Sequence, residues 1–109
     1  MKPHDQLKAL ADPTRLRIAM LLSRGELCVC DLTEVLHLPQ PTISRHIAKL
    51  KSAGVVSDRR AGKWVHYQLM TDPFPTDLTA TVGKHLSHTE PFRSDLDRLD
   101  AYQVRKRCD

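Results

Sequence analysis

The sequence predicts one mainly α-helical domain with a single β-hairpin, and three observations carry this prediction. A chain of 109 residues suits one compact domain. Apolar residues recur at helical spacing through most of the chain, and one β-rich stretch surrounds a glycine turn. We assign residues 1–104 to this single domain and expect a mobile C-terminal tail over residues 105–109.

The N-terminal half predicts four helices. Asp12 is expected to cap the second helix, with Pro13 in its first turn. In the fourth helix, Ile43, Ile47 and Leu50 share the face expected to meet the core. The expected helical ranges are 3–11, 13–23, 31–36 and 41–52, with a short extended piece over 26–29.

A β-hairpin and two more helices are expected in the C-terminal half. Gly62 supplies the turn residue with positive φ at the basic tip of the hairpin. The two helices are expected over residues 76–89, with Thr76 as N-cap, and over about 91–104. Their apolar stripes exceed what a small monomer covers easily, so we expect these terminal helices to pair in a homodimer. The stripes consist of Leu78, Val82 and Leu86, then Phe92, Leu96, Leu99 and Tyr102.

Composition excludes some classes of protein and favours one kind of partner. No stretch approaches the roughly 18–20 apolar residues of a membrane span, and the first residues lack a signal peptide's apolar stretch. We therefore expect a cytoplasmic protein without a membrane partner. Residues 39–70 carry a local charge of +5, whereas the rest of the chain sums to −1. Such a block is typical of a site for nucleic acid, and the alternative is a solvated charged face.

Two short helices around a tight turn, followed by a basic hairpin, describe a winged helix-turn-helix. In this motif the second helix lies in the major groove of DNA, where polar side chains read base edges. The polar face of the fourth expected helix carries Gln40, Thr42, Ser44, Arg45, His46 and Lys49. The motif would explain the local positive charge and predicts double-stranded DNA as the partner.

Three segments in order then resemble the ArsR/SmtB family of metal-sensing repressors. They are residues 10–18 (LADPTRLRI), 26–32 (ELCVCDL) and 39–47 (PQPTISRHI), and the middle one is similar to the arsenic-sensing branch. The resemblance implies a homodimeric repressor without a constitutive cofactor, which binds a partly palindromic operator and leaves it when an inducer binds. The residues at its DNA-contacting helix positions are Gln40, Thr42, Ser44, Arg45 and His46, and those at its wing phosphate contacts are Arg59, Arg60 and Lys63.

The roles of two residues in the segment 39–47 stay open. His46 packs on the preceding helix in the alternative interpretation, instead of contacting DNA. Pro39 stands where the family commonly has a small hydroxyl residue, which leaves the N-cap of the recognition helix open.

Three cysteines fit neither a disulfide framework nor a four-cysteine zinc module, and a reducing compartment keeps them as thiols. The resemblance implies arsenite or antimonite as inducer, bound by Cys28 and Cys30. Residues two apart share a face only on extended backbone, so one ion holds both sulfurs only if this segment is extended or distorted. Cys30 is expected at the N-cap of the helix that begins at Asp31. An ion that prefers another geometry there would disfavour the DNA-competent state.

The third ligand stays open. The arsenic-sensing branch often has a further cysteine where this chain has Thr33. The candidates are Cys108 from the same or the partner's tail, a small cellular thiol, or no third sulfur, in which case methylarsenite suits the pair. His85 and His88 lie where zinc-sensing relatives carry half of a second metal site, although a solvated surface pair is the alternative.

The sequence also allows alternatives to a repressor that responds to arsenic. Cys28 and Cys30 would also serve another thiophilic metal or a redox switch. A small thiol reductase is the remote alternative, and the sequence lacks its Cys-x-x-Cys motif and alternating β/α pattern. Trp64 and Tyr67 are expected to pack within the hairpin instead of stacking on bases.

Overall fold

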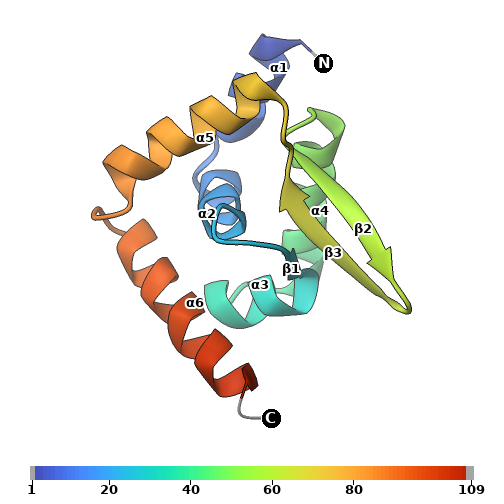
Figure 1. The fold of residues 1–109 in the computed structure, drawn as a ribbon, viewed down its shortest axis with the longest axis vertical. Coiled ribbons are helices and arrows are strands. Elements are labelled where there is room, and N and C mark those ends of the chain that lie inside the picture. The colour runs from blue at the N-terminus through green and yellow to red at the C-terminus, as the bar shows by residue number, and fades with distance from the viewer. Residues whose placement is uncertain (1, 108–109) are drawn as a thin grey trace.

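The computed structural model describes residues 2–107 and places a helical domain beside a small antiparallel sheet (Figure 1). The central helix α2 is flanked by α5 and α6 on one side, and the β2–β3 hairpin projects on the other. The elements in order are α1 (Pro3–Leu10), α2 (Pro13–Leu22), β1 (Leu27–Cys28), α3 (Val29–Leu36), α4 (Gln40–Ser52), β2 (Val56–Ala61), β3 (Trp64–Leu69), α5 (Pro73–Leu86) and α6 (Phe92–Arg107). Among the described helices, none is long and apolar enough to cross a membrane.

Helix α2 is buried on most sides, as its nearly continuous apolar sequence predicts. Ile18, Ala19 and Leu21 are fully buried in the core. The carboxylate of Asp12 accepts a hydrogen bond of 3.0 Å from the backbone N–H of Arg15, which confirms the predicted N-cap. The central helix of the core therefore begins at the residue that the local capping signal predicts.

Helices α3 and α4 are joined by a tight turn. His37 ends α3 in the left-handed conformation, with φ 56° and ψ 40°. Pro39 is the N-cap residue of α4 and provides no side-chain hydrogen bond to it. Ile43, Ile47 and Leu50 are buried as predicted, so the opposite face of α4 remains outside the core.

The sheet has one strand more than the predicted hairpin. β2 and β3 pair from Val56 opposite Leu69 to Ala61 opposite Trp64, and Gly62 at the turn has a φ of +62°. The short β1 pairs with the other edge of β3, which gives the order β1-β3-β2. Cys28 thereby lies opposite His66. The extended piece predicted over 26–29 thus docks the cysteine segment against the hairpin.

The boundaries of both C-terminal helices differ from prediction. α5 begins at Pro73 with Asp72 as N-cap, one turn before the predicted Thr76. The Thr76 hydroxyl instead donates a hydrogen bond of 3.1 Å to the carbonyl of Met70. α6 continues to Arg107, so residues 105–107 of the expected mobile tail are helical. Cys108 lies outside the described residues.

The apolar stripe of α6 is covered within the same chain. Phe92, Leu96 and Leu99 are buried in a core cluster together with α2 and α3. The α6 stripe is therefore covered by its own domain, because α6 folds back across it, whereas Leu78, Val82 and Leu86 of the α5 stripe are only partly buried. Large apolar side chains that remain exposed on described helices are Leu7, Phe74 and Val104.

Candidate functional site

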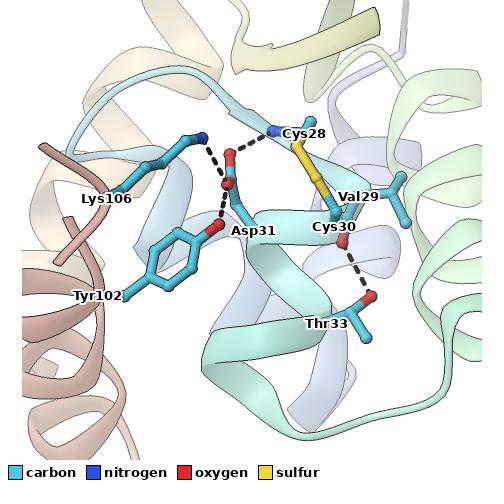
Figure 2. Close-up of a disulfide and its surroundings, with 7 residues drawn as sticks. All are labelled: Cys28, Val29, Cys30, Asp31, Thr33, Tyr102 and Lys106. Atoms are coloured by element: carbon cyan, nitrogen blue, oxygen red, sulfur yellow. Dashed lines mark hydrogen bonds and ion pairs between the residues drawn. A yellow bond between two sulfur atoms is a disulfide. The ribbon is translucent and has the colours of Figure 1, made fainter. Parts of the chain in front are cut away.

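The cysteine pair lies at the junction between the helix-turn-helix and the sheet. Cys28 is the last residue of β1 and the N-cap of α3, with extended backbone at φ −89° and ψ 170°. The predicted N-cap, Cys30, is wrong: the helix begins at Val29 and Cys30 lies in its first turn, because strand pairing ends at Cys28. Within this segment only Cys28 is extended, whereas Val29 and Cys30 are helical, and the change of backbone at the helix start brings the two sulfurs together (Figure 2).

The two cysteines form a disulfide with a Cα–Cα distance of 5.4 Å, where the sequence predicts thiols. The pair is asymmetric in its access to solvent, since Cys28 is buried and Cys30 is exposed. Together with a carboxylate oxygen of Asp31, their sulfurs lie within 4.8 Å of one another. Among the described residues this is the one close group of three side chains able to hold a metal ion.

Asp31 is a buried carboxylate that ties the cysteine segment to α6 (Figure 2). One oxygen accepts a hydrogen bond of 3.0 Å from the backbone N–H of Cys28. The other accepts from the Tyr102 hydroxyl at 2.6 Å and from Lys106 Nζ at 2.9 Å. Sequence reasoning missed this cluster, although an acidic residue in the first turn of a helix is a recognisable capping signal.

The cluster shifts two pKa values. Burial alone would raise the pKa of Asp31, but the hydrogen bonds from Tyr102, Cys28 and Lys106 outweigh it and hold this pKa below its usual range. Burial, together with the hydrogen bond to Asp31, raises the pKa of Tyr102 to about 12. The carboxylate is therefore charged and the phenol protonated at neutral pH.

Replacing Asp31 with asparagine (Asp31→Asn) should lower the free energy of unfolding at neutral pH. It should also make this free energy less sensitive to acid. A carboxylate with a lowered folded pKa stabilises the fold above its unfolded pKa, and this contribution is lost as pH falls through the folded value. We expect the variant to lose about 1–3 kcal/mol at pH 7, and the difference from wild type to shrink below about pH 4. Urea unfolding across this pH range measures both. Asp100→Asn, at an exposed position on α6, is the matched control, and an equal loss in both variants would contradict the assignment.

Among the described residues, no further side chain weighed as a metal ligand in the sequence joins the cysteine pair. Thr33, where the resemblance suggests a further cysteine, donates its hydroxyl hydrogen to the carbonyl of Val29 at 2.9 Å. His85 and His88 are exposed, and α5 ends at Leu86 before the second of them. No third ligand joins these histidines among the residues that the structure describes.

An open cleft of about 590 Å³ connects the cysteine pair with α4 and the hairpin. Cys28 and Cys30 line one part of it, and Gln40 and Ser44 of α4 line another. β3 contributes an apolar wall that includes Trp64. The pair and the predicted DNA-reading side chains thus face one shared space.

The predicted DNA-contacting residues of α4 differ in their exposure to solvent. Gln40 and Arg45 are exposed, and Thr42 and Ser44 are half-buried. The ring of His46 is largely buried, with Nδ1 3.3 Å from Arg15 Nη1 and 3.9 Å from a carboxylate oxygen of Asp12, so it packs at the start of α2. Burial lowers the pKa of His46.

The positively charged residues of the hairpin differ in whether they are paired with an acidic residue. Arg60 and Lys63 are exposed near the tip. Arg59 donates two hydrogen bonds, of 2.7 and 3.0 Å, to Glu26 beside β1. Trp64, expected to pack within the hairpin, is 53% exposed, so the fold covers only about half of it, whereas Tyr67, expected in the hairpin too, packs against the core. Lys63 Nζ lies 5.6 Å from the centre of the Trp64 ring.

A tight turn between α3 and α4, an outward polar face on α4 and a basic hairpin define a winged helix-turn-helix protein. The model of the bacterial regulatory proteins of the arsR family matches residues 12–58. The chain belongs to the ArsR family. This is a family of regulatory proteins and not of enzymes, which excludes a thiol reductase.

Two named relatives are regulators of arsenic or arsenical resistance. The chain is 54% identical over 70 residues to the arsenic resistance transcriptional regulator ArsR1 of Pseudomonas putida, covering 63% of this chain and 55% of the relative. It is 57% identical over 68 residues to the arsenical resistance operon repressor of Escherichia coli K12, covering 62% of this chain and 58% of the relative. The matches thus span little more than half the length of either relative.

Solved structures agree with the fold. The homodimeric winged helix-turn-helix domain of Mb0332 from Mycobacterium bovis, a possible ArsR-family transcriptional regulator, superposes with a TM-score of 0.67. It is 32% identical, and the alignment covers 80% of this chain and 83% of that domain. The likeness therefore extends through most of the structure.

Proposed function

We propose that this chain is a transcriptional repressor that binds operator DNA as a homodimer and leaves it when trivalent arsenic or antimony binds Cys28 and Cys30. The names of the relatives support the arsenical response, and the M. bovis homodimer supports the assembly. Arsenite or antimonite acts as inducer, and no constitutive cofactor is required.

The observation that carries this proposal is the double position of Cys28. It ends the strand that pairs with β3 of the wing, and it begins the first helix of the helix-turn-helix. A ligand that changes the backbone at this residue acts on both DNA-binding elements at once. Couplings between two such sites are typically about 1–3 kcal/mol, or roughly 5–150-fold in affinity.

The inducer reacts with the dithiol form of the pair. Two equivalents of a small cellular thiol reduce the disulfide and are themselves oxidised to a disulfide. Each protein thiol then replaces one hydroxide of arsenous acid: an As–S bond forms, an As–O bond breaks, and the thiol proton leaves with hydroxide as water. Soft thiolates suit this thiophilic ion, whose oxidation state does not change.

Cys108 of the same chain is the proposed third ligand for arsenite. Lys106 Nζ lies 2.9 Å from Asp31, so the end of α6 meets the first turn of α3. Cys108 follows Lys106 by two residues, which span at most about 7 Å when extended. A ligand from the same chain thus needs no help from the partner's tail.

Fluorescence anisotropy on a labelled duplex from the protein's own promoter tests the function. We expect arsenite to release the reduced wild-type protein, and Cys108→Ser to need a higher arsenite concentration. Equal release of both would confine the site to Cys28 and Cys30, or assign the third position to a small thiol. If neither is released, the arsenite response is wrong.

Arg45 and Arg60 are proposed to contribute differently to operator binding. Arg45 is exposed on α4 beside the polar residues, so Arg45→Ala should weaken operator binding by about 1–3 kcal/mol and relax base preference. Arg60→Ala, on the wing, should weaken binding to all sequences and reduce the salt dependence by about one phosphate contact.

Salt titrations on operator and scrambled duplexes separate these two effects. Arg93→Ala, at an exposed position on α6, provides the control for loss of one positive charge. An Arg60→Ala variant that changed only sequence preference would contradict its assignment to the wing.

The disulfide favours a second candidate function, a thiol redox switch at the same pair. In that case an oxidant such as diamide should release the reduced protein from DNA, and arsenite under reducing conditions should not. Release by arsenite in excess reductant would reject the redox switch as the main response.

A further inference from the structure

We propose that the cleft beside Cys28 and Cys30 binds the aryl group of a trivalent arylarsenical, whose arsenic the two sulfurs hold. This inference rests on the proposed function, because it uses the same reduced cysteine pair. It adds a second subsite, the cleft, and a ligand class that occupies both. Phenylarsenous acid is the simplest member of that class.

The described part of the site offers two sulfurs and little else to arsenic. Both oxygens of Asp31 already accept hydrogen bonds, from Cys28 N–H on one side and from Tyr102 and Lys106 on the other. The Thr33 hydroxyl donates to the carbonyl of Val29. An arsenic atom that carries one carbon substituent needs only two sulfurs, so this donor set suits it.

The exchange balances without any further reactant. Each of the two thiols displaces one hydroxide of the arylarsonous acid, two As–S bonds replace two As–O bonds, and two water molecules leave. The As–C bond stays intact, and arsenic remains trivalent. The cysteines enter as thiols, reduced by the small cellular thiol invoked above.

The cleft supplies a place for the organic group next to the sulfurs. Its volume of about 590 Å³ exceeds what an arsenic atom with hydroxyl groups would fill. Val29, Val65 and the rings of Trp64 and Tyr67 provide apolar surface on its wall. Trp64 is 53% exposed, so an aryl group stacked on it would cover apolar surface that the fold leaves open.

The position of the cleft also predicts the effect of such a ligand on DNA binding. Gln40 and Ser44, proposed to read bases, line the same space. An aryl group there would contact the first turns of α4 directly, in addition to the change at Cys28. We therefore expect phenylarsenous acid to release operator DNA from Cys108→Ser as well as from wild type.

Competition against a free dithiol isolates the contribution of the cleft. Dithiothreitol makes the same two As–S bonds but has no apolar wall. We expect the reduced protein to prefer phenylarsenous over methylarsenous acid by about tenfold more than dithiothreitol does, since partial burial of a ring has about this effect. Competition calorimetry measures both ratios.

Variants of the wall assign the preference to its residues. Trp64→Ala and Val65→Ala should each bring the phenyl-to-methyl ratio toward that of dithiothreitol. Phe74→Ala, which removes another exposed aromatic ring outside the cleft, should leave the ratio unchanged. Equal ratios for wild type and dithiothreitol, or no effect of either wall variant, would overturn the inference.

The same samples distinguish this failure from failure of the proposed function. If arsenite releases the operator but the phenyl preference is absent, only the aryl subsite is wrong. If Cys28→Ser binds arsenite and phenylarsenous acid as tightly as wild type, the cysteine pair is not the inducer site and both proposals fall.

Discussion

Cys28→Ser and Cys30→Ser should each abolish release by arsenite while keeping operator binding close to that of wild type. Loss of either sulfur leaves arsenic with too few soft ligands, and the effect should exceed the about 10–100-fold cost of removing an outer-shell partner of a metal site. Operator binding should persist because the side chains proposed to contact DNA lie on α4 and the wing. Anisotropy titrations with arsenite measure both properties.

Thr33→Ser is the matched control for these variants, because it changes a side chain that lines the cleft and keeps the hydroxyl that donates to Val29. It should respond to arsenite as wild type does. Unchanged induction in both cysteine variants would remove the cysteine pair from the mechanism. Loss of operator binding in either one would instead show that the cysteine itself supports the DNA-competent fold.

Asp95→Ala should destabilise the domain by about 2–4 kcal/mol, the expected cost of breaking a buried ion pair whose cations are partly exposed. Asp95 is almost fully buried and accepts two hydrogen bonds of 2.8 Å from Arg17 of α2. It also pairs with Arg98, whose Nε donates to the carbonyl of Val35 in α3. One carboxylate thus holds three helices together, and its removal leaves two arginines without their partner.

Urea unfolding of Asp95→Ala and Asp97→Ala provides the comparison. Asp97 is an exposed acidic residue on the same helix, so its replacement should change stability by less than about 0.5 kcal/mol. Similar midpoints for Asp95→Ala and wild type would contradict the role of the Arg17–Asp95–Arg98 cluster in docking α6.

Features set by neighbouring residues could be predicted from the sequence. Asp12 and Pro13 mark the start of α2, and Gly62 marks the hairpin turn. The helical spacing of Ile43, Ile47 and Leu50 predicts the buried face of α4. In each case the signal and the structure lie within a few residues, so the chain carries the information locally.

Features that depend on distant partners could not be predicted in this way. β1 has only two residues, so nothing in its pattern indicates that it pairs with β3. That pairing keeps Cys28 extended and moves the helix start ahead of the predicted position. Likewise, the stripe of α6 fits an interface as well as it fits the core, and only the fold decides between them.

The candidate site shows the same division. The cysteine pair and the polar face of α4 follow from short motifs. The cleft that joins them, and the contacts of Asp31 with Tyr102 and Lys106, require α3, α4, β3 and α6 to meet in space. Motif spacing therefore predicts the ligands, whereas their surroundings depend on tertiary packing.

The affinity of the reduced protein for arsenite, measured with and without saturating operator DNA, tests the link between the cysteine pair and DNA most directly. Two coupled sites must weaken each other by the same factor, because linkage is reciprocal. We predict that operator DNA lowers arsenite affinity by the factor by which arsenite lowers operator affinity, roughly 5–150-fold. Arsenite affinity that is unchanged by the operator would contradict an inducer site at Cys28 and Cys30 that controls DNA binding.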